Sequence, residues 1–239
     1  MKNPLKRWDV FATLIVLLAA IPAERFEVLS FLEDQTVSFR HILRANYGDP
    51  AETRLREEIV LVSLDETLYA KYGSFPFRRT DIGRLAEIVA SLGARVVALD
   101  FLIDFPSSYD EDGPTVEMLR TAENVLLVST ASFDGEVYNG LTYPTETLRA
   151  VSRSGYSNLE PTSAIVDNLA RVRVHPQITL DKDGWPFAIQ ALALYWGVEP
   201  SLDGNMLTIG EVTVPLDQSN DMYIDFPQLD PGTQYLSMG

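Results

Sequence analysis

The first quarter of the chain carries an unbroken hydrophobic segment followed by a periodic one. Residues 10–23 are apolar except for Thr13, and Pro22 interrupts the segment only near its end. Beyond it, apolar residues recur at steps of three and four positions, the spacing of one helix face. These residues are Phe26, Leu29, Leu32, Phe39 and Leu43, with Thr36 on the same face. The pattern predicts a membrane or signal segment over residues 1–23, then an amphipathic helix and connector over residues 24–56.

The N-terminal segment has three interpretations. Lys2, Lys6 and Arg7 precede it without an acidic neighbour, and such a flank favours a cytoplasmic N-terminus with the body outside. The segment is shorter than the ~20 residues that a bilayer core prefers. A cleaved signal peptide and a buried helix of a cytosolic protein are therefore the two alternative interpretations. Poor small-x-small spacing at Ala20 and Ala23 favours an uncleaved, single-pass membrane anchor, with a periplasmic or extracellular body.

The amphipathic helix also has two interpretations. It could be a signalling stalk that connects the membrane to the body and pairs with a second copy as a homodimer. It could instead pack on its own domain. Two heptads that include Thr36 are few for a coiled coil, so the pattern favours packing.

Residues 57–239 form a separate body in which apolar runs alternate with helical stripes. The runs predict strands at 59–64, 95–102 and 125–128, and the stripes predict helices at 80–92 and 114–123. Thr80 is the expected N-cap and Gly93 the expected end of the first of these helices. A β-α-β-α-β order with non-alternating strands is typical of parallel strands buried on both faces. The sequence predicts a layered α/β domain with a parallel first half.

The second half of the body changes pattern and predicts added antiparallel strands. The expected elements are a strand at 171–180, a helix at 185–196 between Pro186 and Gly197, a hairpin at 206–214 turning near Gly210, and a strand at 222–226.

Composition removes several classes of function. Residues 1–56 carry 8 basic and 7 acidic side chains, whereas residues 57–239 carry 11 and 27, and this acidic body argues against nucleic-acid binding. The chain has no cysteine and 2 histidines, which excludes disulfides, thiolate metal sites and a three-histidine zinc site.

Catalytic motifs are not visible either. There is no Gly-x-Ser-x-Gly elbow, no phosphate-binding Gly-x-x-x-x-Gly-Lys loop and no Gly-x-Gly-x-x-Gly. His175 fits a strand residue better than a base, and residues 110–112 fit solvated charge. We expect no enzyme activity, no cofactor and no metal.

Three blocks of the body, in order, resemble a known family. They are a strand ending in Asp65, the aromatic-Pro-aromatic-x-Arg block at 75–79, and a Gly-Ala-strand-Asp block at 92–101. The combination resembles the second type of CHASE domain. Further similar blocks are residues 155–160, Arg171 and Arg173, residues 214–217 and 223–225, and upstream residues 32–36 with Arg40. Asp167-Asn168 stands where the family has an Asp-Gly turn.

The resemblance implies an extracytoplasmic sensor of bacterial cyclases, histidine kinases or Ser/Thr kinases. The family continues with a closing strand, transmembrane helices and an output domain. The sequence stops at Gly239, before that closing strand, so we expect the sheet to keep an open edge. The signal that it senses is unknown. The alternative is a soluble, exported α/β ligand-binding protein released by signal-peptide cleavage.

Acidic residues mark the candidate site. Asp65, Asp100 and Asp104 follow predicted parallel strands, at the sheet edge where α/β proteins bind ligands. They could bind a ligand or cation, or brace loops, and bracing is the commoner role of such residues. Arg79 matches the family's Arg. It could form a salt bridge with Asp65 or Asp100, which we favour, or hold an anionic ligand.

Phe75 and Phe77 flank Pro76 in the same block. Such aromatic residues most often plug a loop over the sheet edge, and contact with an aromatic ligand is the other interpretation.

Overall fold

The computed structural model describes residues 5–25, 30–49, 58–63, 66–73, 77–134, 137–161, 170–181, 183–224 and 235–237. The chain divides into two compact units. One combines Met1–Ile59, Pro161–Leu169 and Asp225–Thr233, and the other combines Val60–Glu160, Ala170–Ile224 and Gln234–Gly239. The second unit lies within the body predicted at residues 57–239. Asp65 and Phe75 lie outside the described residues.

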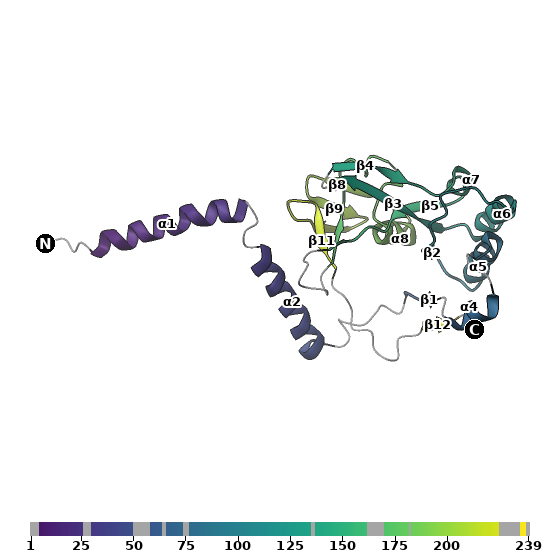
Figure 1. Cartoon of the computed structure of the whole chain (residues 1–239), viewed down its shortest axis with the longest axis horizontal. Helices are drawn as coiled ribbons and strands as arrows, with labels where there is room; N and C mark the ends of the chain where they lie inside the picture. The colour runs from purple at the N-terminus through teal and green to yellow at the C-terminus, as the bar shows by residue number, and fades with distance from the viewer. Residues whose placement is uncertain are drawn as a thin grey trace. The chain divides into compact units, whose positions relative to one another are not determined.

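The described part of the first unit consists of two helices, α1 (Leu5–Arg25) and α2 (Ser30–Tyr47) (Figure 1). Large apolar side chains of α1 are exposed, including Phe11 at 67% and Leu18 at 62%. Within the described ranges, no helix combines the length and the hydropathy that crossing a membrane requires. Helix α2 confirms that the periodic segment is helical over Ser30–Tyr47, and Phe26 and Leu29 lie outside the described residues.

The second unit mixes helices and strands. The helices are α4 (Glu66–Tyr72), α5 (Arg79–Ser91), α6 (Asp112–Ala122), α7 (Glu146–Arg149) and α8 (Phe187–Trp196). The strands are β1 (Leu61–Ser63), β2 (Val97–Leu99), β3 (Val125–Asp134), β4 (Val137–Thr142), β5 (Arg153–Tyr156), β6 (Glu160–Pro161), β7 (Ala170–Arg173), β8 (Pro200–Asp203), β9 (Met206–Ile209), β10 (Val212–Pro215), β11 (Asp221–Tyr223) and β12 (Tyr235–Ser237). The α/β class is confirmed.

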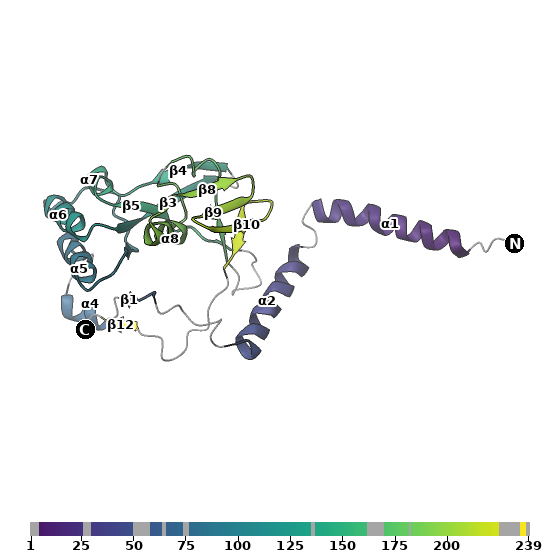
Figure 2. The same cartoon turned by 180° about the vertical axis from the view of Figure 1, so that it is seen from behind.

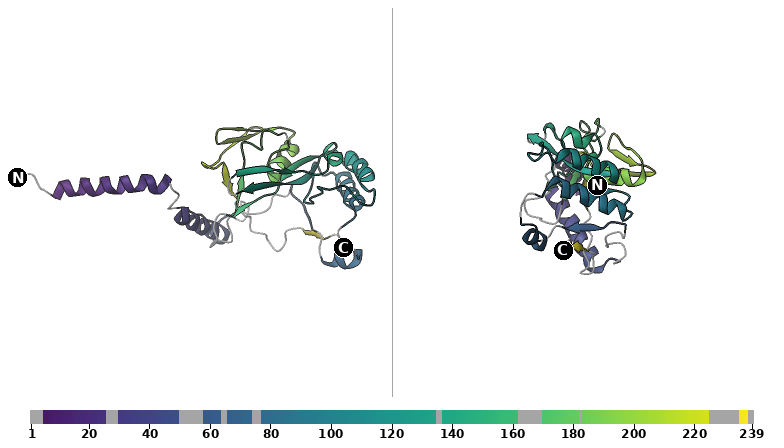
Figure 3. Two further views of the ribbon diagram at one scale, coloured as in Figure 1. Left: turned by 45° about the horizontal axis from the view of Figure 1, so that its top comes forward. Right: turned by 90° about the vertical axis from the view of Figure 1, so that its right-hand side faces the viewer.

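A parallel sheet organises this unit (Figures 1 and 2). β3 pairs in parallel with β2 on one side, with Val97 opposite Val125, and with β5 on the other, with Leu127 opposite Ser154. The far half of β3 continues into an antiparallel hairpin with β4, and Figure 3 shows this long hairpin from another direction. The predicted strands at 95–102 and 125–128 are therefore parallel neighbours.

The first predicted strand has a different place from the expected one. β1 pairs in parallel with β12 in a separate two-stranded sheet, and the third parallel strand beside β3 is β5. The expectation that residues 59–64 join the main parallel sheet is wrong for β1. An apolar run indicates that a segment is suited to a strand, but it does not specify the partner strand. Leu61 of β1 keeps 41% of its surface exposed, unlike a strand buried on both faces.

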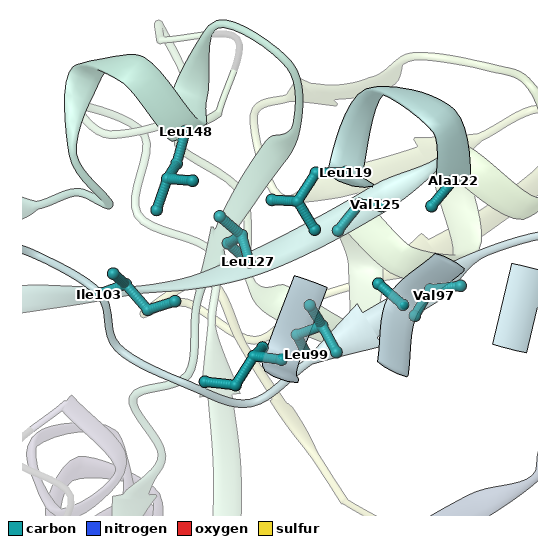
Figure 4. Close-up of a cluster of buried hydrophobic side chains, with 10 residues drawn as sticks. Val97, Leu99, Ile103, Leu119, Ala122, Val125, Leu127 and Leu148 are labelled. Carbon is teal, nitrogen blue, oxygen red and sulfur yellow. The ribbon is translucent and has the colours of Figure 1, made fainter. Parts of the chain in front are cut away.

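Alternate residues of β3 supply two hydrophobic faces. Val125 and Leu127 point into a cluster that α5, α6, α7 and β2 complete (Figure 4). Alternation along a strand turns Leu126 to the opposite face, where α8 contacts β3 and β5. Leu126 and Leu127 are both fully buried, so β3 lies between two layers of helix.

Helix α8 links the parallel sheet to the antiparallel one. Ile189 and Ala193 of α8 pack with Leu207 and Ile209 of β9 in a second hydrophobic cluster, and β9 is the central strand of the antiparallel order β10-β9-β8. The helix follows Pro186 and ends at Gly197, which has a φ of 69°, as the sequence predicts. The predicted hairpin is formed by β9 and β10.

The strand predicted at 171–180 is shorter in the structure. β7 ends at Arg173, and its antiparallel partner is β11. Ile178 and Thr179 both donate their backbone N–H groups to the carbonyl of His175, which makes this part a series of turns. Pro176 within the run disfavours a continued strand because it has no N–H to donate to a ladder.

Candidate functional site

Arg79 stands at the first turn of α5 and is buried at 7% exposure. Its guanidinium forms an ion pair with Asp112 and donates a second hydrogen bond to the carbonyl of Phe105. The same guanidinium lies over the Phe105 ring, 5.0 Å from the centroid. The partner of Arg79 is therefore Asp112, and no described ion pair joins Arg79 to the predicted Asp100.

The acidic pair Glu111–Asp112 completes this arrangement. Asp112 also accepts a hydrogen bond from the backbone N–H of Ser107 at 2.9 Å, and Glu111 accepts one from the N–H of Arg79 at 3.1 Å. Glu111 thereby satisfies an N-terminal donor of α5, whereas Arg78 takes the N-cap position and gives no side-chain cap bond. The expectation that Thr80 is the cap is wrong. The expectation of solvated charge is wrong for Glu111 and Asp112, whereas Asp110 is exposed.

Packing of two helices explains why Asp112 reaches Arg79. α5 and α6 lie side by side, and a Cβ added at Gly83 of α5 would come within 3.2–3.3 Å of Met118 and Thr115 of α6. This close approach brings the first turns of both helices together. The loop after β2 is consequently tied to both helix starts.

The other predicted site residues at this edge have separate positions. Asp100 and Asp104 are exposed. Phe77 is partly buried, packs against the main hydrophobic cluster, and its ring lies 4.8 Å from that of Tyr72. Phe77 also lines a small pocket of about 90 Å³ with Leu68, Tyr72, Asp81, Ile82, Leu85 and Phe101. The structure thus brings Arg79 and Phe77 into packed positions and leaves Asp100 and Asp104 in solvent.

The block at 155–160 joins β3, β5 and β7. The Tyr156 hydroxyl donates to the carbonyl of Arg173, and burial raises the pKa of Tyr156. Asn158 accepts a hydrogen bond from the N–H of Ala131 at 2.7 Å and donates one to its carbonyl at 2.9 Å. The Asn158 amide therefore acts like the backbone of an additional strand residue. These roles stabilise the fold.

An ion pair fastens β7 to β11. Arg173 donates from Nε and Nη2 to the two carboxylate oxygens of Asp221, at 2.8 and 3.0 Å. Asp221 is buried at 3% exposure, and paired geometry of this kind is what makes a buried carboxylate tolerable. Arg171, on the same strand, lies over the Tyr223 ring at 4.5 Å.

A pocket of about 300 Å³ lies at the amino edge of the parallel sheet, opposite the carboxyl edge. It is lined by residues that precede or begin the parallel strands and by the last turn of α8: Arg95, Asn124, Arg153, Gln190, Ala193, Leu194, Gly197, Val198 and Glu199. Arg95 precedes β2, Asn124 precedes β3 and Arg153 begins β5. This pocket is thus at the amino edge, not at the carboxyl edge where the sequence places the candidate site.

Asp183, Glu199 and Gln190 all contact the Arg153 guanidinium. Its Nε donates to Asp183 at 2.8 Å, and its Nη1 and Nη2 donate to the two carboxylate oxygens of Glu199 at 3.0 and 3.2 Å. The Gln190 amide, with its oxygen turned to the guanidinium, accepts from Nη2 at 2.7 Å. Burial lowers the pKa of Arg153, but the bonds to Glu199 and Asp183 outweigh burial and raise it overall.

A second charged group borders Asp183. The Tyr143 hydroxyl donates to Asp181 at 2.7 Å, and the Arg149 guanidinium lies 3.7 Å from the Tyr143 ring centroid. Burial raises the pKa of the Asp181 carboxyl. The hydrogen bonds from the Tyr143 hydroxyl and from the backbone N–H of Asp183 lower this pKa by more, so the net shift is downward. The arrangement keeps the Asp181 carboxylate ionised.

His175 lies among aromatic rings. Its ring centroid is 5.9 Å from that of Phe133 and 5.5 Å from that of Tyr138. Burial and, to a smaller degree, the charge of Arg173 lower the pKa of His175. Within the described part of the chain, its buried Nδ1 has no hydrogen-bond partner.

The pocket residues are the part of the site that sequence reasoning missed. Arg95 begins a predicted strand and lies in a block that resembles the family, but no binding role was assigned to it, and Asn124, Gln190 and Glu199 stand in no motif. Among the described residues, no group of three or more His, Asp or Glu side chains could hold a metal ion.

A comparison with protein families identifies the fold family of the chain. The family model described as CHASE2 domain matches residues 10–239. No curated protein and no solved structure matches the chain.

Proposed function

The chain belongs to the CHASE2 domain family, sensory domains of signalling proteins that are extracellular and not catalytic, and from this premise we propose that it is the membrane-anchored, extracytoplasmic sensor of a cyclase or kinase. The observation that carries the proposal is the extent of the family match, which covers residues 10–239 and thus nearly the whole chain. The signal enters through the α/β unit and reaches the output domain through the helical segments.

The sequence of the N-terminal region supports the anchor. Lys2, Lys6 and Arg7 precede the apolar segment at 10–23, and basic residues on this side favour a cytoplasmic N-terminus. The exposed apolar side chains of α1 need a nonpolar environment to cover them. A bilayer provides that environment.

Helix α2 supports assembly as a homodimer. Phe39, Ile42 and Leu43 recur at three- and four-residue steps and are 59%, 50% and 40% exposed. A second copy of the same helix would cover this face. Pairing of stalk helices would couple two sensor units to two output domains.

Reporter fusions test the topology. A periplasmic reporter such as alkaline phosphatase, fused after Gly239 in a bacterial host, should be active and should fractionate with the membrane. A cytoplasmic reporter at the same position should be inactive, and the reverse pattern would overturn the proposal. A soluble exported chain whose mature N-terminus lies near Glu24 would instead support the released binding protein.

A further inference from the structure

The 300 Å³ pocket at the amino edge of the parallel sheet contains an arginine whose charge no described carboxylate balances. Arg95 lines the pocket and is exposed, and its guanidinium lies 5.0 Å from the centroid of the Tyr195 ring. Across the described ranges, no acidic side chain forms an ion pair with Arg95. A guanidinium that lies over an aromatic ring uses its face for that contact and keeps its in-plane N–H groups available for an anion.

The other two charged residues of the lining are paired with each other. Nη1 and Nη2 of Arg153 donate to the two carboxylate oxygens of Glu199 at 3.0 and 3.2 Å. Asp183, which also accepts from Arg153, does not line the pocket and has a second cation, Arg149, at 3.4 Å. The lining residues include two arginines and one glutamate, so the charge that is left over is the positive charge of Arg95. A ligand that complements this lining is a monoanion.

The C-terminal end of α8 borders the same pocket, and free carbonyl groups at a helix end disfavour anions. Here the backbone after the helix occupies two of them. The N–H of Gly197 donates to the carbonyl of Leu194 at 3.2 Å. The N–H of Val198 donates to the carbonyl of Ala193 at 3.0 Å. This glycine cap reduces the negative potential that the end of α8 would otherwise present to an anion.

A neutral donor lies at the neighbouring strand start. Asn124 lines the pocket, is exposed and directly precedes β3. Its carbonyl accepts the N–H of Val97 at 3.0 Å, so the start of β3 adjoins the start of β2, which follows Arg95. Within the part of the chain that the structure describes, the side-chain amide of Asn124 makes no hydrogen bond. Its NH₂ group can therefore donate to a carboxylate bound at Arg95.

Apolar side chains and size define the rest of the pocket. Ala193, Leu194 and Val198 contribute aliphatic surface. At about 30 Å³ per water molecule, the 300 Å³ volume corresponds to about ten non-hydrogen atoms. Beyond a carboxylate group, this leaves room for an aliphatic chain of about five to seven carbons.

We propose that this pocket is the ligand site of the sensor and that it binds a short aliphatic monocarboxylate. The carboxylate lies on Arg95 and Asn124, and the aliphatic chain lies against Leu194 and Val198. Arg153 and Glu199 make no contact with the ligand in this arrangement, because each is engaged by the other. The inference rests on the proposed sensory function and names the class of its ligand.

Probes with one carbon chain test the charge. The full 239-residue chain is titrated by calorimetry in a mild detergent with hexanoate, with the neutral 1-hexanol and with the cationic hexylamine, and protein-free detergent is the blank. Hexanoate should bind, and the alcohol and the amine should bind roughly tenfold or more weakly because the charge-assisted contact with Arg95 is lost. Absence of hexanoate binding, or equal binding of hexanoate and 1-hexanol, would overturn the proposal.

A pair of arginine variants assigns the carboxylate contact. Arg95→Ala should weaken hexanoate binding roughly tenfold or more. Arg84→Ala, an equal change of charge at an exposed position of α5, should leave hexanoate binding unchanged. An Arg95→Ala chain that binds hexanoate like the wild type would contradict the assignment, and Arg95→Gln repeats the test if Arg95→Ala does not fold.

Acetate tests the aliphatic part of the ligand. It should bind more weakly than hexanoate to the wild type, because it has no chain to place against the aliphatic surface. Leu194→Ala should weaken hexanoate binding roughly threefold or more and leave acetate binding unchanged. Equal affinities of acetate and hexanoate for the wild type would show an anion site without an aliphatic subsite and would overturn the ligand class.

The outcomes separate this inference from the proposed function. An external reporter without hexanoate binding would remove the carboxylate ligand and leave the sensor in place. Hexanoate binding with a cytoplasmic reporter would leave the ligand site in place and overturn the extracytoplasmic sensor.

Discussion

At the scale of single residues, Arg79 shows how a residue marked by sequence obtains its role from distant partners. The block at 75–79 identifies it as an important arginine, and the structure places it between the loop after β2 and the first turn of α6. Its carboxylate partner, Asp112, is 33 positions away. Arg79 therefore connects the two helix starts through Asp112, and contact with an anionic ligand, the alternative interpretation, stays a hypothesis.

Arg79→Ala should destabilise the domain without any ligand. The side chains of the pair are 9% and 22% exposed, and removal of one partner of a buried pair leaves a stranded charge that costs on the order of 3 kcal/mol. The measurement is urea unfolding of the wild type and the variant. Arg84→Ala, which removes an exposed arginine of the same helix, should change the free energy of unfolding by less than about 0.5 kcal/mol.

A double-mutant cycle distinguishes the brace from a ligand contact. In the Arg79→Ala background, Asp112→Asn should cost less than it does in the wild type, because the charge that it removes is already unpaired. Additive effects, or an Arg79→Ala chain as stable as the wild type, would contradict the brace and favour an anion contact.

His175 should make stability depend on pH. Burial, then Arg173, lowers the pKa of His175 in the folded state below its ordinary value of 6.5, so the folded state binds fewer protons than the unfolded state there. The linked stability is complete above about pH 6.5 and is lost as the pH falls through the lowered folded pKa. Urea melts between about pH 5 and 7.5 should therefore give a free energy of unfolding that decreases toward acid.

The two histidines of the chain provide a matched control for this effect. His175→Phe keeps a ring beside Phe133 and Tyr138 and should flatten the pH dependence, whereas His41→Gln should retain it. Carboxylates that titrate over the same range are common to all three chains, so only the difference between the profiles is diagnostic. Parallel profiles for the wild type and His175→Phe would refute the assignment.

At the scale of elements, β5 and α8 approach so closely that one side chain would separate them. A Cβ added at Gly155 would lie 2.8 Å from the Cα of Phe187 and 3.1 Å from the carbonyl oxygen of Trp185. The N–H of Tyr156 donates to that same carbonyl at 3.1 Å. The glycine in the block at 155–160 is thus needed for the contact between strand and helix.

Gly155→Ala should destabilise the domain by about 1–3 kcal/mol, because the neighbours that it meets are backbone atoms that cannot rotate away. Gly113→Ala is the control, since a Cβ there meets nothing within 4 Å and alanine is the better helix former. Thermal unfolding followed by circular dichroism measures both. A Gly155→Ala chain that melts at the wild-type temperature would show that the contact is looser than the structure indicates.

At the scale of the whole molecule, the exposed face of α2 leads to a prediction about assembly. The chain has no cysteine, so a single introduced cysteine reports only on its own surroundings. If α2 pairs with its copy in parallel, Phe39→Cys should form a disulfide-linked dimer on mild oxidation in membranes. Arg40→Cys, the next and also exposed position, faces another side of the helix and should stay largely monomeric on a non-reducing gel.

Equal cross-linking at both positions would indicate random collision. Absence of cross-linking at Phe39→Cys and Ile42→Cys alike would favour the other interpretation of this helix, that it packs on its own domain.

Local sequence signals determined most of the elements of this protein. Pro114 lies in the first turn of α6, and α8 begins directly after Pro186 and ends directly before Gly197. Proline and glycine mark these ends because they restrict or relax the backbone at their own position. Helical periodicity likewise located α2 and α5. The ordered blocks were specific enough to identify the family.

Only the tertiary structure decided which elements meet. β1 pairs with β12, Arg79 with Asp112, and Arg153 with Glu199 across 46 positions. The pocket combines the starts of three strands with the end of α8. Each contact depends on strand order and on helix packing, which are set by the burial of many side chains at once, whereas hydropathy and turn residues report only on their own neighbourhood.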